Sequence, residues 1–186
     1  MQLLEISRVI LCASIFFAGI QTCLASSACD ALNNMEDCVV SNHARAEVAL
    51  NGQYKKSISS LSGSFKDNLK SVEISWLDYR RDTCGSLNQL DSLGCESSLS
   101  DQRTQELYLI DRRIGVGVSY GVVDFISREF GGGSDNSLLA MMLVKQPQSE
   151  SWSSYSEKHC RMMNELVGEK IELCKIRLIL NNWEGF

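Results

Sequence analysis

The sequence predicts an all-α protein made of helical hairpins that disulfides hold together. Apolar residues recur every three or four positions from Ala46 to Tyr79, which is the spacing of one helix face. The chain of 186 residues contains a single proline, Pro147, so long helices are permitted. Six of the eight cysteines follow an apolar leader, and an even number in an exported chain indicates a disulfide framework.

The leader has the features of a cleaved signal peptide. A weakly basic start is followed by an apolar run at 9–20 that is too short to span a bilayer. Small residues then permit cleavage after Ala25 or Ala28. We therefore expect residues 1–28 to be removed, leaving a periplasmic or secreted protein without a stable membrane span. An uncleaved anchor and a buried helix are the alternatives.

Cleavage at either position removes Cys12 and Cys23 and leaves six cysteines, which allow many connectivities. Proximity along the chain suggests three short-range disulfides, each closing a short loop that stabilises the fold by restricting the unfolded chain. The suggested pairs are Cys29–Cys38, Cys84–Cys95 and Cys160–Cys174.

After a cysteine-bounded lead-in at 29–43, the apolar stripe predicts helices over 44–61 and 65–83. Gly63 and neighbouring serines interrupt it, and Ser64 is a candidate N-cap for the second helix. The two helices are antiparallel neighbours in one interpretation and a single bent helix in the other. The stripe consists of Leu50, Tyr54, Ile58, Leu61, Phe65, Leu69, Val72, Trp76 and Tyr79.

A loop at 84–95 and a helix at 96–113 are expected next. Leu99, Arg103, Leu107 and Ile110 share one face of that helix. A disulfide from Cys84 to Cys95 would fasten it to the preceding helix and staple the hairpin at its turn.

The rest of the chain predicts a connecting segment and a second hairpin. Three glycines and alternating valines at 114–123 fit a short strand or an irregular crossing, within a connecting segment at 114–137. The second hairpin unit spans 138–186: a buried helix begins at Leu138 and stops at Pro147, and helices at 150–166 and 169–182 follow.

A Trp-x2-Tyr-x4-Cys pattern occurs twice, at Trp76 and at Trp152. Tyr79 and Cys84 complete the first copy, and Tyr155 and Cys160 complete the second. Only Arg177 stands near the place of a further shared residue. The second half is thus predicted to be a degenerate copy of the first hairpin, the alternative being two unrelated hairpins.

Residues 29–110 resemble the LprI-like family of small exported bacterial domains, named for a lysozyme inhibitor. Four pieces occur in family order: a Cys pair around acidic and amide residues, Leu-Asn-x2-Tyr, Trp-x2-Tyr-Arg-x3-Cys, and Cys before Arg-Thr-x-Glu-Leu. The resemblance implies an α-helical, disulfide-bonded domain, which we place at 29–113. Its motif residues, for which structural roles are expected, are Leu50, Asn51, Tyr54, Trp76, Tyr79, Arg80, Arg103, Glu106 and Leu107.

The chain departs from the family pattern at three places. The usual acidic residue after the Tyr-Arg pair is displaced, because Arg81 follows Arg80 and Asp82 comes next. Glu73 stands where the family has glutamine, and the Gly-Gly-Ser turn between Cys84 and Cys95 is missing. If that turn contacts a target, target recognition differs in this chain.

No residue set predicts catalysis, a metal site or a cofactor, so we expect a binding protein rather than an enzyme. His43 and His159 are the only histidines and lack a cluster of carboxylates, and Cys160 beside His159 is expected in a disulfide. Trp76 and Tyr79 are expected in the core. Arg80 and Arg103 are expected in ion pairs with Glu73 or Glu106, and the remaining charges on solvated faces.

Net charge of −5 argues against nucleic acid as a partner and is compatible with a basic protein. The first function hypothesis is therefore inhibition of a basic lysozyme or similar muramidase, as the resemblance implies. The alternatives are an immunity or chaperone-like protein against another envelope effector, and a structural envelope protein.

Overall fold

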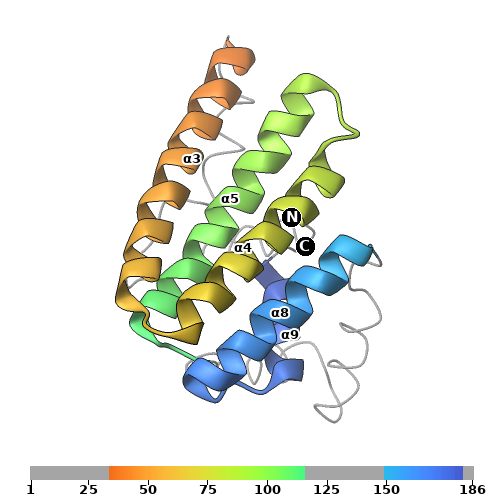
Figure 1. Ribbon diagram of the computed structural model, residues 1–186. Helices are drawn as coiled ribbons and strands as arrows, with labels where there is room; N and C mark the ends of the chain where they lie inside the picture. Colours follow the sequence, from red (N-terminus) through yellow and green to blue (C-terminus); the bar gives the residue numbers. More distant parts are fainter. Residues whose placement is uncertain (1–33, 116–148, 182–186) are drawn as a thin grey trace, which may run out of the picture.

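The computed structural model describes residues 34–115 and 149–181, and every regular element in these two ranges is an α-helix (Figure 1). The all-α prediction is thereby confirmed. The helices are α3 (Met35–Ser60), α4 (Ser64–Cys84), α5 (Gln89–Arg112), α8 (Glu150–Val167) and α9 (Ile171–Asn181). The predicted leader, the glycine-containing segment from 116 and the helix from Leu138 lie outside the described residues.

Helices α3, α4 and α5 run down, up and down, so α3 and α5 are parallel (Figure 1). His43 on α3 lies 3.2 Å from Glu96 on α5, and Ser57 further along α3 donates a 2.7 Å hydrogen bond to the carbonyl of Leu107 further along α5. The expected neighbour of α3 was α4, but α3 packs mainly on α5. This arrangement brings the start of α3, the end of α4 and the start of α5 to one end of the unit.

Two predicted helix starts were too late. Helix α3 begins at Met35, inside the predicted lead-in, because Glu36 and Asp37 in its first turn favour a helix N-terminus although that turn has little to bury. Helix α5 begins at Gln89, inside the predicted loop, because the side chain of Asn88 accepts a 3.1 Å hydrogen bond from the backbone N–H of Asp91.

The break between α3 and α4 is real, which excludes one continuous bent helix. Leu61 is extended, and Gly63 has a φ of 57°, a conformation that favours glycine. Gly63 occupies the N-cap, whereas Ser64 is already helical, so the predicted Ser64 cap is wrong.

The second half forms a hairpin that lies across α4. Ser149 caps α8 by accepting a 3.1 Å hydrogen bond from the N–H of Trp152, and Gly168 ends the helix at a φ of 71°. Lys158 on α8 donates a 2.7 Å hydrogen bond to Ser75 on α4, and the register of further contacts shows that the two helices are antiparallel.

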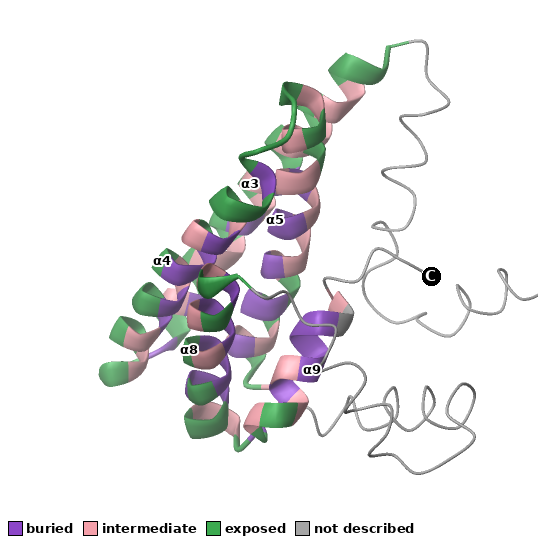
Figure 2. Ribbon diagram, turned by 90° about the vertical axis from the view of Figure 1, so that its right-hand side faces the viewer, coloured by how far each residue is buried: buried purple, intermediate pink, exposed green. Residues whose placement is uncertain are grey.

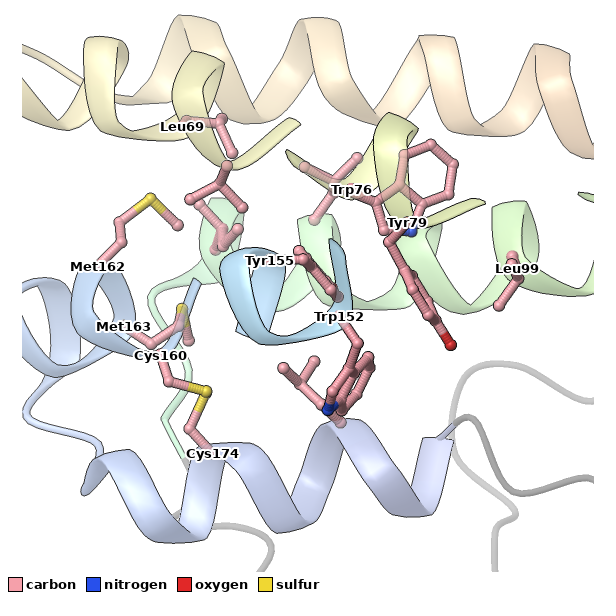
Figure 3. Close-up of a cluster of buried hydrophobic side chains, with 14 of the residues drawn as sticks. Leu69, Trp76, Tyr79, Leu99, Trp152, Tyr155, Cys160, Met162, Met163 and Cys174 are labelled. Atoms are coloured by element: carbon pink, nitrogen blue, oxygen red, sulfur yellow. A yellow bond between two sulfur atoms is a disulfide. The ribbon is translucent and has the colours of Figure 1, made fainter. Parts of the chain in front are cut away.

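One core joins the two halves, and its buried side chains line the inner faces of the helices (Figures 2 and 3). Tyr79 stacks on Tyr155 with ring centres 5.9 Å apart and planes 11° apart, and it lies 5.1 Å from Trp152. The two tyrosines hold equivalent places in the two Trp-x2-Tyr-x4-Cys patterns. That the halves are copies of one hairpin stays a prediction.

Disulfides close both hairpins, joining Cys84 to Cys95 and Cys160 to Cys174, the pairs that proximity suggested. Cys38 is also disulfide-bonded, and its suggested partner Cys29 lies outside the described residues. Among the described helices, none combines the length and the apolar character that crossing a membrane requires.

Candidate functional site

The most concentrated chemistry in the described residues is a buried network of charges between the two halves. Its centre is Glu106 on α5, whose carboxylate accepts hydrogen bonds from Arg177 and Asn181 on α9. Nε2 of His159 on α8 lies 3.2 Å from the Glu106 carboxylate, at ion-pair distance but not aligned for a hydrogen bond. Glu106 therefore connects three helices inside the protein.

Arg103, one turn before Glu106, is the second centre of this network. Its guanidinium donates hydrogen bonds of 2.8 and 3.0 Å to Glu73 on α4 and lies 3.2 Å from Nδ1 of His159. It also lies over the ring of Tyr155 at 5.5 Å. The ion pair with Glu73 is one of those expected from the sequence. The glutamate that replaces the family glutamine thus neutralises a fully buried arginine.

The outer end of the network is closed by Glu169, just before α9, which accepts hydrogen bonds of 2.8 and 2.9 Å from Arg177. Both residues are buried. Each arginine therefore has one carboxylate partner within its own half: Arg103 has Glu73, and Arg177 has Glu169.

Glu106, His159 and the two arginines have strongly shifted pKa values. Burial alone would raise the pKa of Glu106, but the charge of Arg177 and its hydrogen bond outweigh burial and hold that pKa well below its usual range. Burial lowers the pKa of His159 to about 4, against the opposing pull of Glu106. Burial opposes charge on Arg103 too, yet Glu73 holds its pKa above the usual value. At neutral pH Glu106 and the two arginines are charged and His159 is neutral.

A second, smaller network holds Arg80. Its guanidinium donates to Glu47 on α3 and, at 2.9 Å, to the hydroxyl of Ser100 on α5, which in turn donates a 2.8 Å hydrogen bond to Glu47. Arg80 also covers the ring of Trp76 at 4.9 Å. Sequence reasoning expected Glu73 or Glu106 as its partner, which was wrong, because Glu47 lies on a helix whose packing the sequence does not reveal.

The other motif residues are split between core and surface. Leu50, Trp76, Tyr79 and Leu107 are buried, and Tyr54 is half-buried against the core. Asn51 is exposed and donates a 2.9 Å hydrogen bond to the carbonyl of Glu47 in its own helix. Thr104 likewise bonds only within α5, to the carbonyl of Ser100. The motif therefore builds the interior rather than an open reaction centre.

The residues that could suggest a metal or catalytic site have structural partners instead. Cys160 is in a disulfide, and His159 contacts Arg103 and Glu106. The exposed Arg81 lies 2.8 Å from Asp78. Within 34–115 and 149–181, no group of three histidine, cysteine or acidic side chains is arranged to hold a metal ion.

The two ends of the α3–α4–α5 unit carry surface charges of opposite sign. The end formed by the start of α3, the end of α4 and the start of α5, at the top of Figure 1, carries six carboxylates together with Arg81 and the partly buried Arg80. The opposite end carries six exposed lysines and arginines with Asp67 and Asp111. The acidic residues are Glu36, Asp37, Asp78, Asp82, Asp91 and Glu96. The basic residues are Lys55, Lys56, Lys66, Lys70, Arg112 and Arg113.

Helix electrostatics explains only part of this separation. Acidic residues at the starts of α3 and α5 favour the helix dipole, as Glu36 and Asp91 do. Asp82 in the last turn of α4 and Lys66 in its first turn stand at the unfavourable ends. Asp82 and Lys66 therefore increase the charge difference between the two ends without stabilising α4. Because the stability of the helices does not explain this placement, the acidic end is the candidate interaction surface.

A shallow groove of about 300 Å³ lies between α4 and α8. Val72 and Met162 form its buried apolar part, and much of its charged rim is paired internally, as Arg161 is with Glu157 at 3.0 Å. It offers no cluster of convergent polar groups beyond these pairs.

The chain was compared with known protein families, curated proteins and solved structures. Residues 23–107 match the family described as Lysozyme inhibitor LprI. The resemblance to LprI is thereby confirmed. The LprI match contains α3, α4 and most of α5, including Arg103 and Glu106, and stops before the second half. Neither a curated protein nor a solved structure matches the chain.

Proposed function

We propose that the protein inhibits a lysozyme-type muramidase, binding it through the acidic end of the α3–α4–α5 unit. The LprI match carries this proposal, because it covers that unit and its family is described as a lysozyme inhibitor. The disulfides of both hairpins are typical of exported proteins, and an exported protein would meet a muramidase at the cell wall.

The charge separation supports a basic partner. Opposite charges steer two proteins together over distances comparable to the Debye length, about 8 Å at physiological salt. The acidic end meets that requirement with carboxylates on three helix termini that the disulfide from Cys84 to Cys95 helps to hold in place. Inhibition would then weaken as salt is added.

The mechanism requires only binding and exclusion. A rigid helical end that docks at the enzyme's cleft would keep the glycan strand out, without any chemical step. Helix α4 and the motif residues would serve by holding the three termini in one arrangement.

The test is a lysis assay with the oxidised protein from residue 29 and basic lysozymes of several classes acting on cell walls. We expect dose-dependent protection. The triple variant Glu36→Gln, Asp78→Asn and Asp82→Asn should raise the half-inhibitory concentration at least tenfold and flatten its salt dependence.

The matched control removes three exposed carboxylates from the second half, by Glu150→Gln, Glu165→Gln and Glu172→Gln. It changes net charge equally but leaves the acidic end intact, so inhibition should stay within about twofold of the unaltered protein. Equal loss in both variants would refute docking at the acidic end. Absence of protection by a folded sample would refute inhibition itself, and retention on the walls would favour the structural role.

A further inference from the structure

His159 is placed where all the elements at the junction of the two halves meet. It is fully buried on α8, and the groups that face it come from every element packed there. Helix α5 contributes Arg103 and Glu106, α9 contributes Arg177, and Tyr155 lies one turn earlier on α8 itself. Behind these stand Glu73 on α4, paired with Arg103, and Glu169, paired with Arg177.

The ring has one arrangement of protons that fits these neighbours. Arg103 can only donate, so Nδ1 of His159 must accept across the 3.2 Å between them. The single proton of the neutral imidazole then lies on Nε2, towards Glu106. A second proton can enter only at Nδ1, where it would face the N–H of Arg103. A charged His159 is therefore opposed by Arg103 for as long as α8 stays against α5.

The chain contains a second histidine–glutamate pair with which the His159–Glu106 pair can be compared. His43 also lies 3.2 Å from a glutamate, Glu96, but those two side chains are 23% and 31% exposed. The corresponding values for His159 and Glu106 are 0% and 3%. His43 is therefore partly in contact with water, whereas any charge on the ring of His159 must be accommodated by the protein alone.

The ion pairs are arranged so that the junction can separate. Arg103 keeps Glu73, since both belong to the α4–α5 hairpin, and Arg177 keeps Glu169, since both belong to the second half. Of the three carboxylates in this network, Glu106 alone has its partners across the junction. Separation therefore strands neither arginine, and Glu106 becomes hydrated. Each hairpin also retains its own disulfide.

We infer that the junction is an acid-sensitive latch, in which proton uptake by His159 releases α8 and α9 from α4 and α5. In the released form Tyr79, Arg103 and Glu106 on the LprI-matched half are uncovered, and the released imidazole is charged in water.

The expected size of the pH effect follows from the pKa of His159 in the closed and in the released form. The pKa of His159 is about 4 in the closed form and has its usual value of 6.5 once released. The equilibrium constant for closing therefore falls about tenfold for each pH unit between 6.5 and 4. It is largest above pH 6.5, where His159 is neutral in both forms.

The test is amide hydrogen exchange of the full oxidised chain at pH 7.5 and pH 5, corrected for the intrinsic rate. We expect protection in α8, α9 and the facing side of α4 to fall at least tenfold at pH 5, while the α3–α5 contact keeps its protection. A uniform loss in all helices, or no loss, would overturn the latch.

The decisive variant is His159→Gln, whose amide can accept from Arg103 and donate to Glu106 but cannot take up a proton. It should keep the protection of α8 and α9 unchanged between the two pH values. The matched control His43→Gln should respond to acid as the unaltered protein does. A loss of protection in His159→Gln equal to that of the unaltered protein would contradict the inference.

A titration of the unaltered protein followed by NMR of the His159 ring decides the question without any substitution. The ring should charge only in step with the loss of protection. A ring that charges near pH 6.5 while α8 stays protected would also contradict the inference.

Discussion

Truncation of Glu106 to alanine should be among the most damaging single changes in the described residues. The substitution removes the carboxylate that binds Arg177 and Asn181 and lies 3.2 Å from His159. Arg177 keeps Glu169, but it stays buried with one carboxylate instead of two.

Breaking a buried ion pair by removing one partner costs about 3–5 kcal/mol, because the other charge stays out of water without compensation. We expect Glu106→Ala to lower the free energy of unfolding by that amount. Glu96→Ala is the control, since Glu96 lies equally far from its own histidine, His43, but the pair is partly exposed. Exposed pairs contribute about 0–1 kcal/mol.

The measurement is urea unfolding at pH 7.5, followed by circular dichroism on oxidised samples with equal transition slopes. A loss below about 1 kcal/mol for Glu106→Ala, or equal losses for the two variants, would show that the junction is hydrated or open. The description of Glu106 as a buried centre between three helices would then be wrong.

Three further predictions concern stability. Trp76→Ala should lower the free energy of unfolding by about 3–5 kcal/mol, while alanine at the exposed Tyr108 should change it by about 0.5 kcal/mol or less; an unchanged melting temperature for the first would place Trp76 at the surface. Replacing Cys160 and Cys174 together by serine should cost about 2–4 kcal/mol in the same urea assay, and a neutral effect would mean that this disulfide does not form. Stability should rise from pH 4 to 6.5 by up to about 3 kcal/mol, because the unfolded chain binds a proton at His159 that the folded chain does not; urea melts across this range should show the slope, and a flat profile would refute a buried neutral His159.

The sequence predicts the interior well where a periodic signal exists. The apolar stripe of α3 and α4 is buried or half-buried as its spacing indicates, and Leu99, Arg103, Leu107 and Ile110 do share a buried face. A spacing of three and four is a property of one helix, so it can be read without knowledge of the partner helix.

Features that depend on the partner helix could not be predicted. Glu47 carries no local sign that it binds Arg80, because the contact requires α3 to lie beside both α4 and α5. Glu169 lies just before a helix, and the sequence alone gives it the appearance of an ordinary surface charge. Its burial becomes evident only from its ion pair with Arg177. Asn88 is a recognisable N-cap residue. The prediction missed the helix start that follows it because the loop was assumed to extend from Cys84 to Cys95.

The parallel pairing of α3 and α5 has a consequence for the order of events during synthesis. The contacts that hold α3 join residues far apart in the chain, such as His43 and Glu96, which are 53 residues apart. Helices α4 and α5, and likewise α8 and α9, meet across short turns and can pair soon after each is made. Helix α3, the first of the described helices to be synthesised, must therefore wait for α5 before its apolar side is covered. During that interval α3 is the segment that a chaperone would hold, and variants that slow the α4–α5 turn should prolong its exposure to proteases.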